Sequence, residues 1–343
     1  MDLMELNLYI DELLQEKELE RGQPFRERLK KNLRSYQQYI ESRKEFSDVT
    51  EDVKKFIDVL DEVVRSYLKG KIISALNTFS RWWQRNEKEN FLLYQCNPEI
   101  EFYRIRKKGN NPFRREDLFH VPFDKRGKLG NYRYSISGFP CLYLGRSIYA
   151  CWEETRRPPL DSFFISRVKL SEGKTLELLD LRVNQQREDY ELRKYLVMLP
   201  LIIACSMRNW NEENTFVAEY IIQQILMQSL MRVNGEKPSF DGVIYTSSVV
   251  DNSFGFVSTN TDLQDCVAIP VQKVKENGFC ENLSSIFELS APICYEYELI
   301  QGFSPLKWET ATETGNTYKS SYFSLLEERL REKNDCRQIN AIS

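Results

Sequence analysis

Three side chains with the chemistry of an active site lie in three separate segments of the chain. Arg104 lies at the end of one short apolar run, Glu154 belongs to an acidic pair on an expected helix, and Ser247 follows a third apolar segment. Ends of strands and helices often supply active-site residues, because a rigid scaffold fixes the side chains that loops then expose. A guanidinium can bind an anion, a carboxylate can stabilise positive charge, and a hydroxyl can hydrogen-bond a polar substrate.

These segments resemble the RES-domain family, which is named after its Arg, Glu and Ser residues. Four matching segments are FYRIR at 102–106, YRYS-x-x-G at 132–138, CLYLGRSIYACWEE at 141–154 and FDGVIYTSS at 240–248. Their order and spacing make the match more specific than any one of them alone, and together they span about residues 100 to 270. Known members act on NAD, and many are the toxins of bacterial toxin–antitoxin pairs. The resemblance implies an α+β fold, with a mixed-sheet, ADP-ribosyltransferase-like catalytic domain after an α-helical N-terminal domain.

The resemblance gives both candidate arginines a role in binding phosphate. Arg104 is expected to contact a phosphate of NAD or to orient an attacking phosphate, and Arg106 competes with it on the same strand face. Arg133 matches the family's second arginine and is expected to hold phosphate as well. The alternative for Arg104 is a surface ion pair with Glu101 or Glu116.

The segment 141–154 carries the candidate carboxylate. Tyr143 ends an expected strand and would shape the substrate pocket, and Ser147 is a natural N-cap for the following helix. Spacing from these two residues favours Glu154 as the family's glutamate, with Glu153 as the second choice. The alternative is a pair of solvated glutamates on a helix face.

The remaining candidates have alternatives that concern only structure. Tyr134 could face nicotinamide or adenine, or could fill the core. Ser247 is expected to hydrogen-bond the substrate or, alternatively, to cap a turn. Gln224 is a further candidate for substrate binding. His120 is expected to be a hydrogen-bonded core histidine, and Gly145 to permit a tight turn.

The function implied by the resemblance is cleavage of the nicotinamide–ribose bond of NAD, by hydrolysis or phosphorolysis, in a toxin- or defence-like enzyme. NAD is then a substrate, and no cofactor or metal is expected. Alternatives are an ADP-ribosyltransferase that modifies a protein, and a catalytically inactive protein-interaction module. Implied partners are inorganic phosphate and an antitoxin or inhibitor protein, and a homo-oligomer is expected.

Composition argues against several other classes of protein. The net charge of −3 and the pI near 5.7 give no basic footprint for nucleic acid. Eight cysteines without a CxxC pair and a single histidine do not fit common zinc sites and indicate a reduced, cytoplasmic protein. The N-terminus lacks the pattern of a signal peptide, and no uncharged stretch approaches the ~20 residues that cross a membrane.

Periodicity predicts the elements that must position the candidates. Residues 1–97 are expected to form a helical regulatory or oligomerisation domain, 98–300 the RES-type domain, and 301–343 a partly helical extension. Helices are expected at 24–46, after a cap at Thr50, and at 71–86, 147–155, 190–209, 215–233 and 321–333. Strands are expected in the segments IEFYRI, CLYLG, FFISRVKL, LELLDL, DGVIYTS and DCVAIPV.

Overall fold

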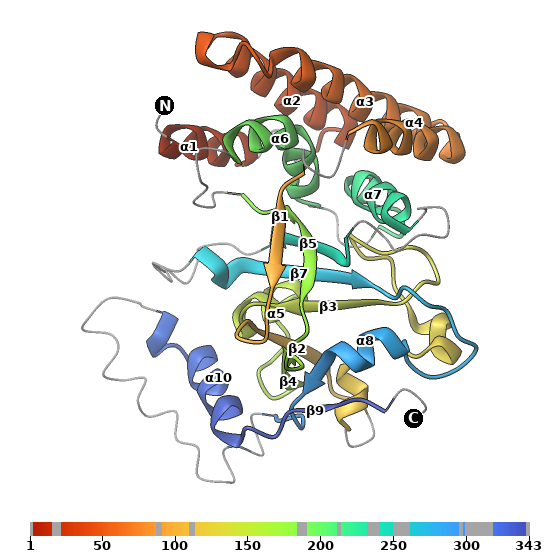
Figure 1. Cartoon of the computed structure of the whole chain (residues 1–343), viewed down its shortest axis with the longest axis vertical. Coiled ribbons are helices and arrows are strands. Elements are labelled where there is room, and N and C mark those ends of the chain that lie inside the picture. Colours follow the sequence, from red (N-terminus) through yellow and green to blue (C-terminus); the bar gives the residue numbers. More distant parts are fainter. Residues whose placement is uncertain are drawn as a thin grey trace. The chain divides into compact units, whose positions relative to one another are not determined.

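A computed structural model gives the fold of the chain (Figure 1). It describes residues 3–15, 22–86, 91–109, 114–183, 191–210, 214–231, 240–249, 261–294, 298 and 318–340. Contacts divide the chain into two compact units. The first unit comprises 1–94, 130–137 and 178–243, and the second comprises 95–129, 138–177 and 244–343. The units are therefore not continuous in sequence, and the domain ranges 1–97, 98–300 and 301–343 stay predictions.

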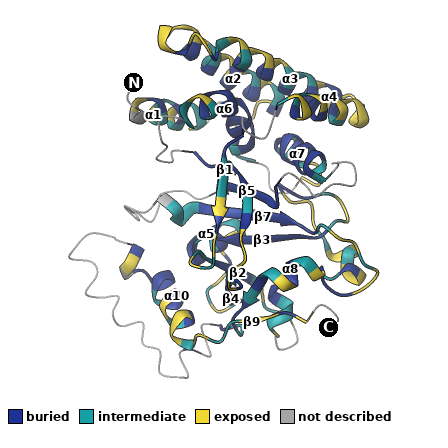
Figure 2. Ribbon diagram, viewed as in Figure 1, coloured by how far each residue is buried: buried dark blue, intermediate teal, exposed yellow. Residues whose placement is uncertain are grey.

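Helices dominate the first unit. They are α1 (Leu3–Leu14), α2 (Phe25–Glu41), α3 (Thr50–Leu68), α4 (Ile72–Arg85), α6 (Leu192–Ser206) and α7 (Ile221–Met231). Helix α3 contacts α2, α4, α6 and α7, and its buried side chains follow the predicted apolar spacing. Helices α2 to α4 each bury one face and expose the other, whereas α6 is buried along most of its length (Figure 2). The apolar run at 196–205 is therefore a core helix, with Pro200 inside it.

Several helix boundaries differ from the sequence expectation; helix α7, for example, begins at Ile221 rather than at 215, after a 3-10 turn at Ala218–Tyr220. Thr50 is the first residue of α3 rather than its cap, and its hydroxyl donates to the Phe46 carbonyl at 3.0 Å. Helix α2 ends at Glu41 instead of near Phe46, and a short 3-10 turn, η2 (Lys44–Phe46), follows. At this end the Ser42 hydroxyl donates to the Tyr39 carbonyl at 2.8 Å, a local bond that competes with continuation of the helix.

The described strands form a nine-stranded sheet in the order β1-β5-β6-β7-β3-β2-β4-β8-β9. They are β1 (Leu93–Cys96), β2 (Glu101–Lys107), β3 (Cys141–Gly145), β4 (Phe163–Leu170), β5 (Leu176–Leu181), β6 (Gly242–Thr246), β7 (Asp265–Pro270), β8 (Phe287–Leu289) and β9 (Arg337–Gln338). All six predicted strands are present, and the short strands β1, β8 and β9 were not predicted. Strand β2 pairs antiparallel with both β3 and β4, and β3 pairs antiparallel with β7. The mixture of helices with this sheet confirms the predicted α+β class.

Short helices surround these strands in the second unit. They are α5 (Ile148–Glu154), α8 (Glu281–Ile286) and α10 (Tyr322–Lys333), with 3-10 turns η9 (Thr261–Gln264) and η12 (Tyr318–Ser320) near the residues of interest. Helix α10 begins after the N-cap Ser321 and ends at Lys333, which confirms the predicted C-terminal helix.

His120 is a buried core histidine, as predicted. Its Nε2 accepts a hydrogen bond from the Cys280 amide at 2.9 Å, so its Nδ1 carries the proton that faces the Val121 carbonyl at 2.9 Å. Burial lowers the pKa of the imidazole to about 4. The neutral ring is hydrogen-bonded through both nitrogens and has no exposed surface, so His120 is a structural residue and not a proton carrier.

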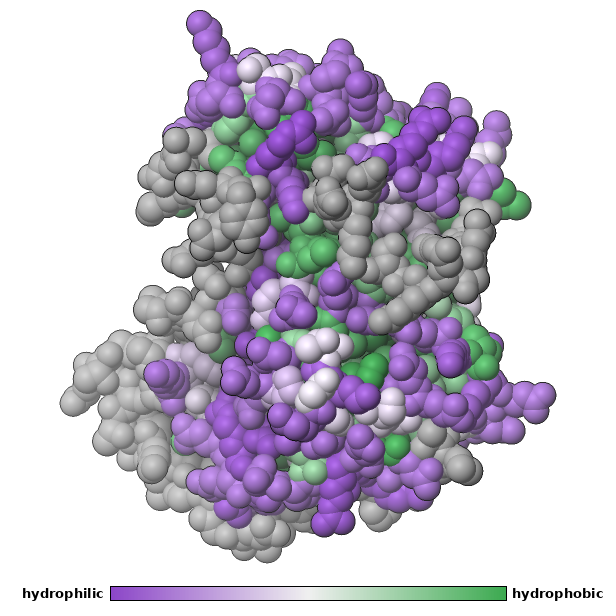
Figure 3. All heavy atoms as spheres, viewed as in Figure 1, coloured by the Kyte–Doolittle hydropathy of each residue, from purple (hydrophilic) through white to green (hydrophobic). Residues whose placement is uncertain are grey.

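Hydrophilic side chains cover much of the coloured surface in Figure 3. Large apolar side chains that remain exposed include Ile73, Phe216 and Tyr132. Within the described part of the chain, no helix is both long and apolar enough to span a membrane.

Candidate active site

Helix α5 starts immediately after β3 and is held there by close packing. Ser147 is its N-cap, as predicted: the Ser147 Oγ accepts from the Ala150 amide at 2.9 Å and donates to the Leu263 carbonyl at 2.5 Å. A Cβ on Gly145 would lie 2.7 Å from the Cys151 Sγ and 3.0 Å from the Ser147 carbonyl oxygen. The chain passes from β3 to α5 over only two residues, and Gly145 permits this tight turn through its missing Cβ rather than through a positive φ. Glycine is required because the helix lies directly against the strand.

The end of α5 meets the segment that follows β6. The Ser247 amide donates to the Gln264 carbonyl at 2.9 Å, which fixes the backbone, and the Ser247 Oγ donates to Glu154 Oε1 at 2.6 Å. Ser247 is buried and Glu154 is partly exposed. The fold thus joins two candidates that are 93 residues apart in sequence.

Glu153 occupies a different environment from its neighbour. Its side chain is 1% exposed, and its Oε2 accepts from the Arg157 Nε at 2.8 Å. Both Arg156 and Arg157 have a positive φ, which turns the chain sharply after α5. Glu153 is therefore a buried structural carboxylate, whereas Glu154 presents its carboxylate to Ser247, and the geometry favours Glu154 as the active carboxylate.

Arg104 lies on β2, and its Nη1 donates to the Tyr143 carbonyl of the neighbouring strand β3. Burial raises the pKa of the Cys151 thiol to about 12. The positive charge of Arg104 opposes that rise, and the negative charge of Glu154 adds to it. Cys151 itself donates to the carbonyl of Tyr103, the residue before Arg104 on β2, and lies on the helix that ends in Glu154, so Arg104 and Glu154 belong to two elements in contact within the second unit.

Arg106, the expected competitor of Arg104, and Glu101, one of its two expected ion-pair partners, are engaged with other groups. Arg106 donates through Nη2 to the Phe119 carbonyl at 3.1 Å. Glu101 pairs with Arg167 at 3.1 Å and with Arg331 at 2.7 Å. The structure thus gives Glu101 other arginine partners, which weakens the ion-pair alternative for Arg104.

Tyr143 lies at the centre of β3, opposite Ala268 of β7. Burial raises the pKa of the Cys141 thiol to about 12, and the positive charge of Arg104 opposes this rise. Residues two apart on a strand share a face, so Tyr143 and Cys141 lie side by side. Tyr143 therefore takes part in the candidate site both through its carbonyl, which holds Arg104, and through its strand position.

Arg133 belongs to the first unit, where its guanidinium closes the end of α6. Its Nη1 donates to the Cys205 and Met207 carbonyls at 2.9 Å and 3.0 Å, and its guanidinium lies over the Tyr220 ring at 5.3 Å. Carbonyls at the end of a helix need such donors, so these contacts give Arg133 a structural role. Its predicted role in phosphate binding has less support than that of Arg104.

Tyr134 and Gln224 also belong to the first unit. Tyr134 is 1% exposed, which favours the core alternative over a ligand-facing ring. Gln224 donates through Nε2 to Asn131 Oδ1 at 2.6 Å and to the Tyr132 carbonyl at 3.2 Å. Gln224 and Arg133 thus fasten the YRYS loop to α7 and α6.

Two further residues accompany Glu154 and Ser247. Cys151 donates from its thiol to the Tyr103 carbonyl at 3.1 Å, which ties α5 to β2. Asp265 is fully buried at the start of β7; its carbonyl accepts from the Arg146 amide at 2.8 Å, and its carboxylate lies 3.5 Å from the Thr246 hydroxyl. The spacing of Cys151 from Glu154 signals a shared helix face, whereas no local pattern marks Asp265.

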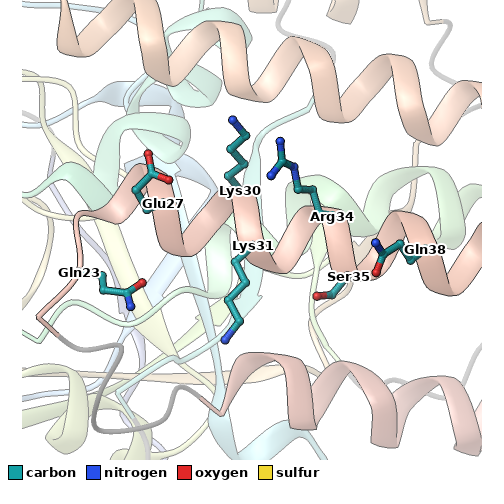
Figure 4. Close-up of a pocket in the computed structure, with 7 residues that line it drawn as sticks. All are labelled: Gln23, Glu27, Lys30, Lys31, Arg34, Ser35 and Gln38. Carbon is teal, nitrogen blue, oxygen red and sulfur yellow. The ribbon is translucent and has the colours of Figure 1, made fainter.

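A cavity of about 400 Å³ is lined by residues of α2 and its N-terminal approach. Lys30 and Arg34 extend from one side of α2 and Lys31 from the other (Figure 4). None of the predicted site residues lines this cavity.

Comparison with known proteins assigns the chain to a family. The RES domain model matches residues 101–278, slightly more than half of the chain. The chain belongs to the RES-domain family. The matched range of the RES domain includes all seven predicted site residues but ends before α10.

A similar protein was also found among curated sequences. The chain is 31% identical over 291 residues to a Bacillus subtilis (strain 168) protein named "Putative toxin YopC". This match covers 76% of the chain and 64% of the relative, so the chain spans slightly less than two thirds of the relative's length. No solved structure matches the chain.

Proposed function

We propose that this RES-domain protein consumes NAD by cleaving the bond between nicotinamide and ribose. The observation that carries the proposal is the hydrogen bond of 2.6 Å between the Ser247 hydroxyl and the Glu154 carboxylate, formed where the ends of β6 and α5 meet. It brings the Glu and Ser candidates together in the unit that also holds Arg104. Membership of the RES-domain family supports NAD as the substrate.

Glu154 would act on the sugar. As nicotinamide departs, positive charge develops on the ribose ring, and a nearby carboxylate lowers the energy of that oxocarbenium-like state. Donation from Ser247 fixes one carboxylate oxygen, and the partial exposure of Glu154 leaves the side chain within reach of a substrate. A carboxylate whose position is already set loses less free energy to reorganisation during the reaction.

Arg104 would bind the pyrophosphate of NAD or an attacking phosphate. A guanidinium suits this task because it presents several N–H donors in a fixed plane and stays charged at neutral pH. The Tyr143 carbonyl accepts from Nη1 and so fixes the side chain on β2. The acceptor of the ribosyl group would be water, which yields ADP-ribose, or inorganic phosphate, which yields a phosphorylated ADP-ribose.

Toxicity and restraint would follow from this chemistry. Loss of NAD harms the cell that contains the enzyme, and the relative YopC carries the name of a toxin. A cell that makes such an enzyme needs a means of restraint, for which an antitoxin or inhibitor protein is the expected partner. The helical first unit is a candidate surface for this partner or for formation of a homo-oligomer.

Product analysis tests the proposal directly. Purified full-length protein is incubated with NAD, with and without inorganic phosphate, and the products are separated by chromatography and identified by mass. We expect release of nicotinamide in the wild type, a large loss in Glu154→Gln, and no loss in Glu276→Gln, an exposed glutamate of the same unit. Absence of nicotinamide release in both buffers would overturn the proposal. Transfer of labelled ADP-ribose to a polypeptide would point to the transferase alternative.

A further inference from the structure

Helix α10 lies outside the RES domain match but packs against the helix that carries Glu154. The match ends at residue 278, whereas α10 spans Tyr322–Lys333 and belongs to the second unit. Helices α10 and α5 are in contact. Their apolar side chains share one buried cluster, which includes Ile148, Tyr149, Cys151, Phe323, Leu326 and Leu330.

Within this apolar contact lies a buried carboxylate, that of Glu327. It is 4% exposed, and its Oε1 accepts hydrogen bonds from the Ile148 amide at 2.8 Å and from the Tyr318 hydroxyl at 2.6 Å. Its Oε2 lies 3.6 Å from Nη2 of Arg331. A carboxylate in an apolar contact is costly unless donors of this kind satisfy it, so the contacts define its position closely.

Glu327 complements the N-cap of α5. The first amides of a helix have no partner within the helix. Ser147 satisfies the Ala150 amide, and Glu327 satisfies the Ile148 amide from another part of the chain. Ser147 and Glu327 lie 180 residues apart in sequence, and together they fix the first turn of α5 by hydrogen bonds to its amides.

We propose that Glu327 is a positioning residue for the candidate active site, because its carboxylate holds the first turn of the helix that ends in Glu154. Helix α5 has only seven residues. At a rise of about 1.5 Å per residue it behaves as a short rigid rod of about 10 Å, so its first turn determines where its last residue lies. Glu327 therefore sets the distance between Glu154 and Ser247. The catalytic consequence rests on the proposed NAD cleavage, whereas the fixing of α5 does not.

The electrostatic surroundings show which variant preserves this role. Burial raises the pKa of the Glu327 carboxyl to about 7, and donation from Tyr318 and Ile148 and the charge of Arg331 oppose that rise. The charged and titratable groups that act on it also include Glu101 and Tyr103 of β2. The hydrogen bonds from Ile148 and Tyr318 both end on Oε1, so the amide oxygen of a glutamine can accept them in its place.

The experiment compares Glu327→Ala, Glu327→Gln and Glu328→Ala in the full-length protein. Glu328 is the exposed neighbour on the same helix and serves as the control. Hydrogen–deuterium exchange is followed in peptides that cover residues 144–154, and kcat and KM for NAD are measured on the same preparations. Should the alanine variant not fold, Glu327→Met, which retains the volume but lacks the acceptor, takes its place.

We expect exchange in α5 to become about tenfold faster in Glu327→Ala, in line with loss of a buried hydrogen bond. The kcat should fall about tenfold or more while KM changes little, because Arg104 lies on β2 and not on α5. Glu327→Gln should retain most of the exchange protection of α5 and most of the wild-type kcat, and the control Glu328→Ala should match the wild type. The proposal fails if α5 exchange is unchanged in the alanine variant, or if the glutamine variant behaves like alanine. If the wild type releases no nicotinamide, the proposed function fails, and exchange alone decides whether Glu327 holds the helix.

Discussion

Replacement of Gly145 by alanine is the sharpest test of how the candidate site is assembled. The added Cβ would lie 2.7 Å from the Cys151 Sγ, 3.0 Å from the Ser147 carbonyl oxygen and 3.3 Å from the Cys151 amide nitrogen. The first distance is shorter than real Cβ contacts allow, and the other two involve backbone that cannot rotate away. Helix α5 must therefore move away from β3.

Overpacking of this kind costs about 1 to 3 kcal/mol. For a unit of this size, about 2 to 4 °C of melting temperature corresponds to each kcal/mol, so we expect a decrease of about 2 to 12 °C. The same displacement would move Glu154 away from Ser247, so NAD cleavage should fall as well. Thermal denaturation followed by circular dichroism measures the first effect, and the nicotinamide assay measures the second.

A matched control and a double-mutant cycle make the reasoning refutable. A Cβ on Gly127, in the same unit, would meet nothing within 4 Å, so Gly127→Ala should stay within about 0.5 kcal/mol of the wild type. Removing the Sγ in Gly145→Ala/Cys151→Ala relieves the shortest contact, and the pair should couple by about 0.5 to 3 kcal/mol. Strict additivity of the two substitutions, or a neutral Gly145→Ala, would show that close packing of α5 on β3 does not require glycine.

Four further predictions follow from the contacts and the pKa shifts of these residues. Glu154→Gln should lower kcat at least about 100-fold with little change in melting temperature. Glu153→Gln should instead lower the melting temperature, because the buried Glu153 carboxylate loses its ion pair with Arg157, and the reverse pattern would exchange the two roles. Ser247→Ala removes a hydrogen bond to a charged group and should cost about 10- to 100-fold in kcat/KM by nicotinamide release. The pKa of His120 is lowered from 6.5 to about 4, so the folded state binds fewer protons and stability should decline as pH falls from 6.5 to about 4; His120→Gln should flatten this slope in melts across pH. The pKa of Glu327 is raised from 4.5 to about 7, so its contribution to folding stability should be present at low pH and be lost as pH rises from 4.5 to about 7. If the Glu327→Gln protein lost the same stability over this pH range, the loss could not be assigned to Glu327.

Sequence patterns were sufficient for the elements that carry a strong local signal. Apolar periodicity predicted α3 and most of α7, and short apolar runs between turn residues predicted the six longer strands, because burial of one face imposes a regular spacing on the chain. The N-cap at Ser147 was also predictable, since its hydroxyl satisfies an amide three residues away. Short strands and helix ends escaped prediction where side-chain bonds such as that of Ser42 compete with the backbone pattern.

The sequence by itself determined which residue types the candidate site contains, through motifs that identify a RES domain. Only the tertiary structure decided which of them meet. Glu153 and Glu154 are neighbours in sequence, yet the buried carboxylate of Glu153 pairs with Arg157, whereas Glu154 accepts a hydrogen bond from the Ser247 hydroxyl. Arg133 and Tyr134 belong to the same motif, but Arg133 donates to a carbonyl at the end of α6 and Tyr134 is buried in the core. Such distinctions depend on contacts between segments far apart in the chain, and no local pattern encodes them. The hydrogen bond between Glu327 and the Ile148 amide of α5 is a contact of the same kind.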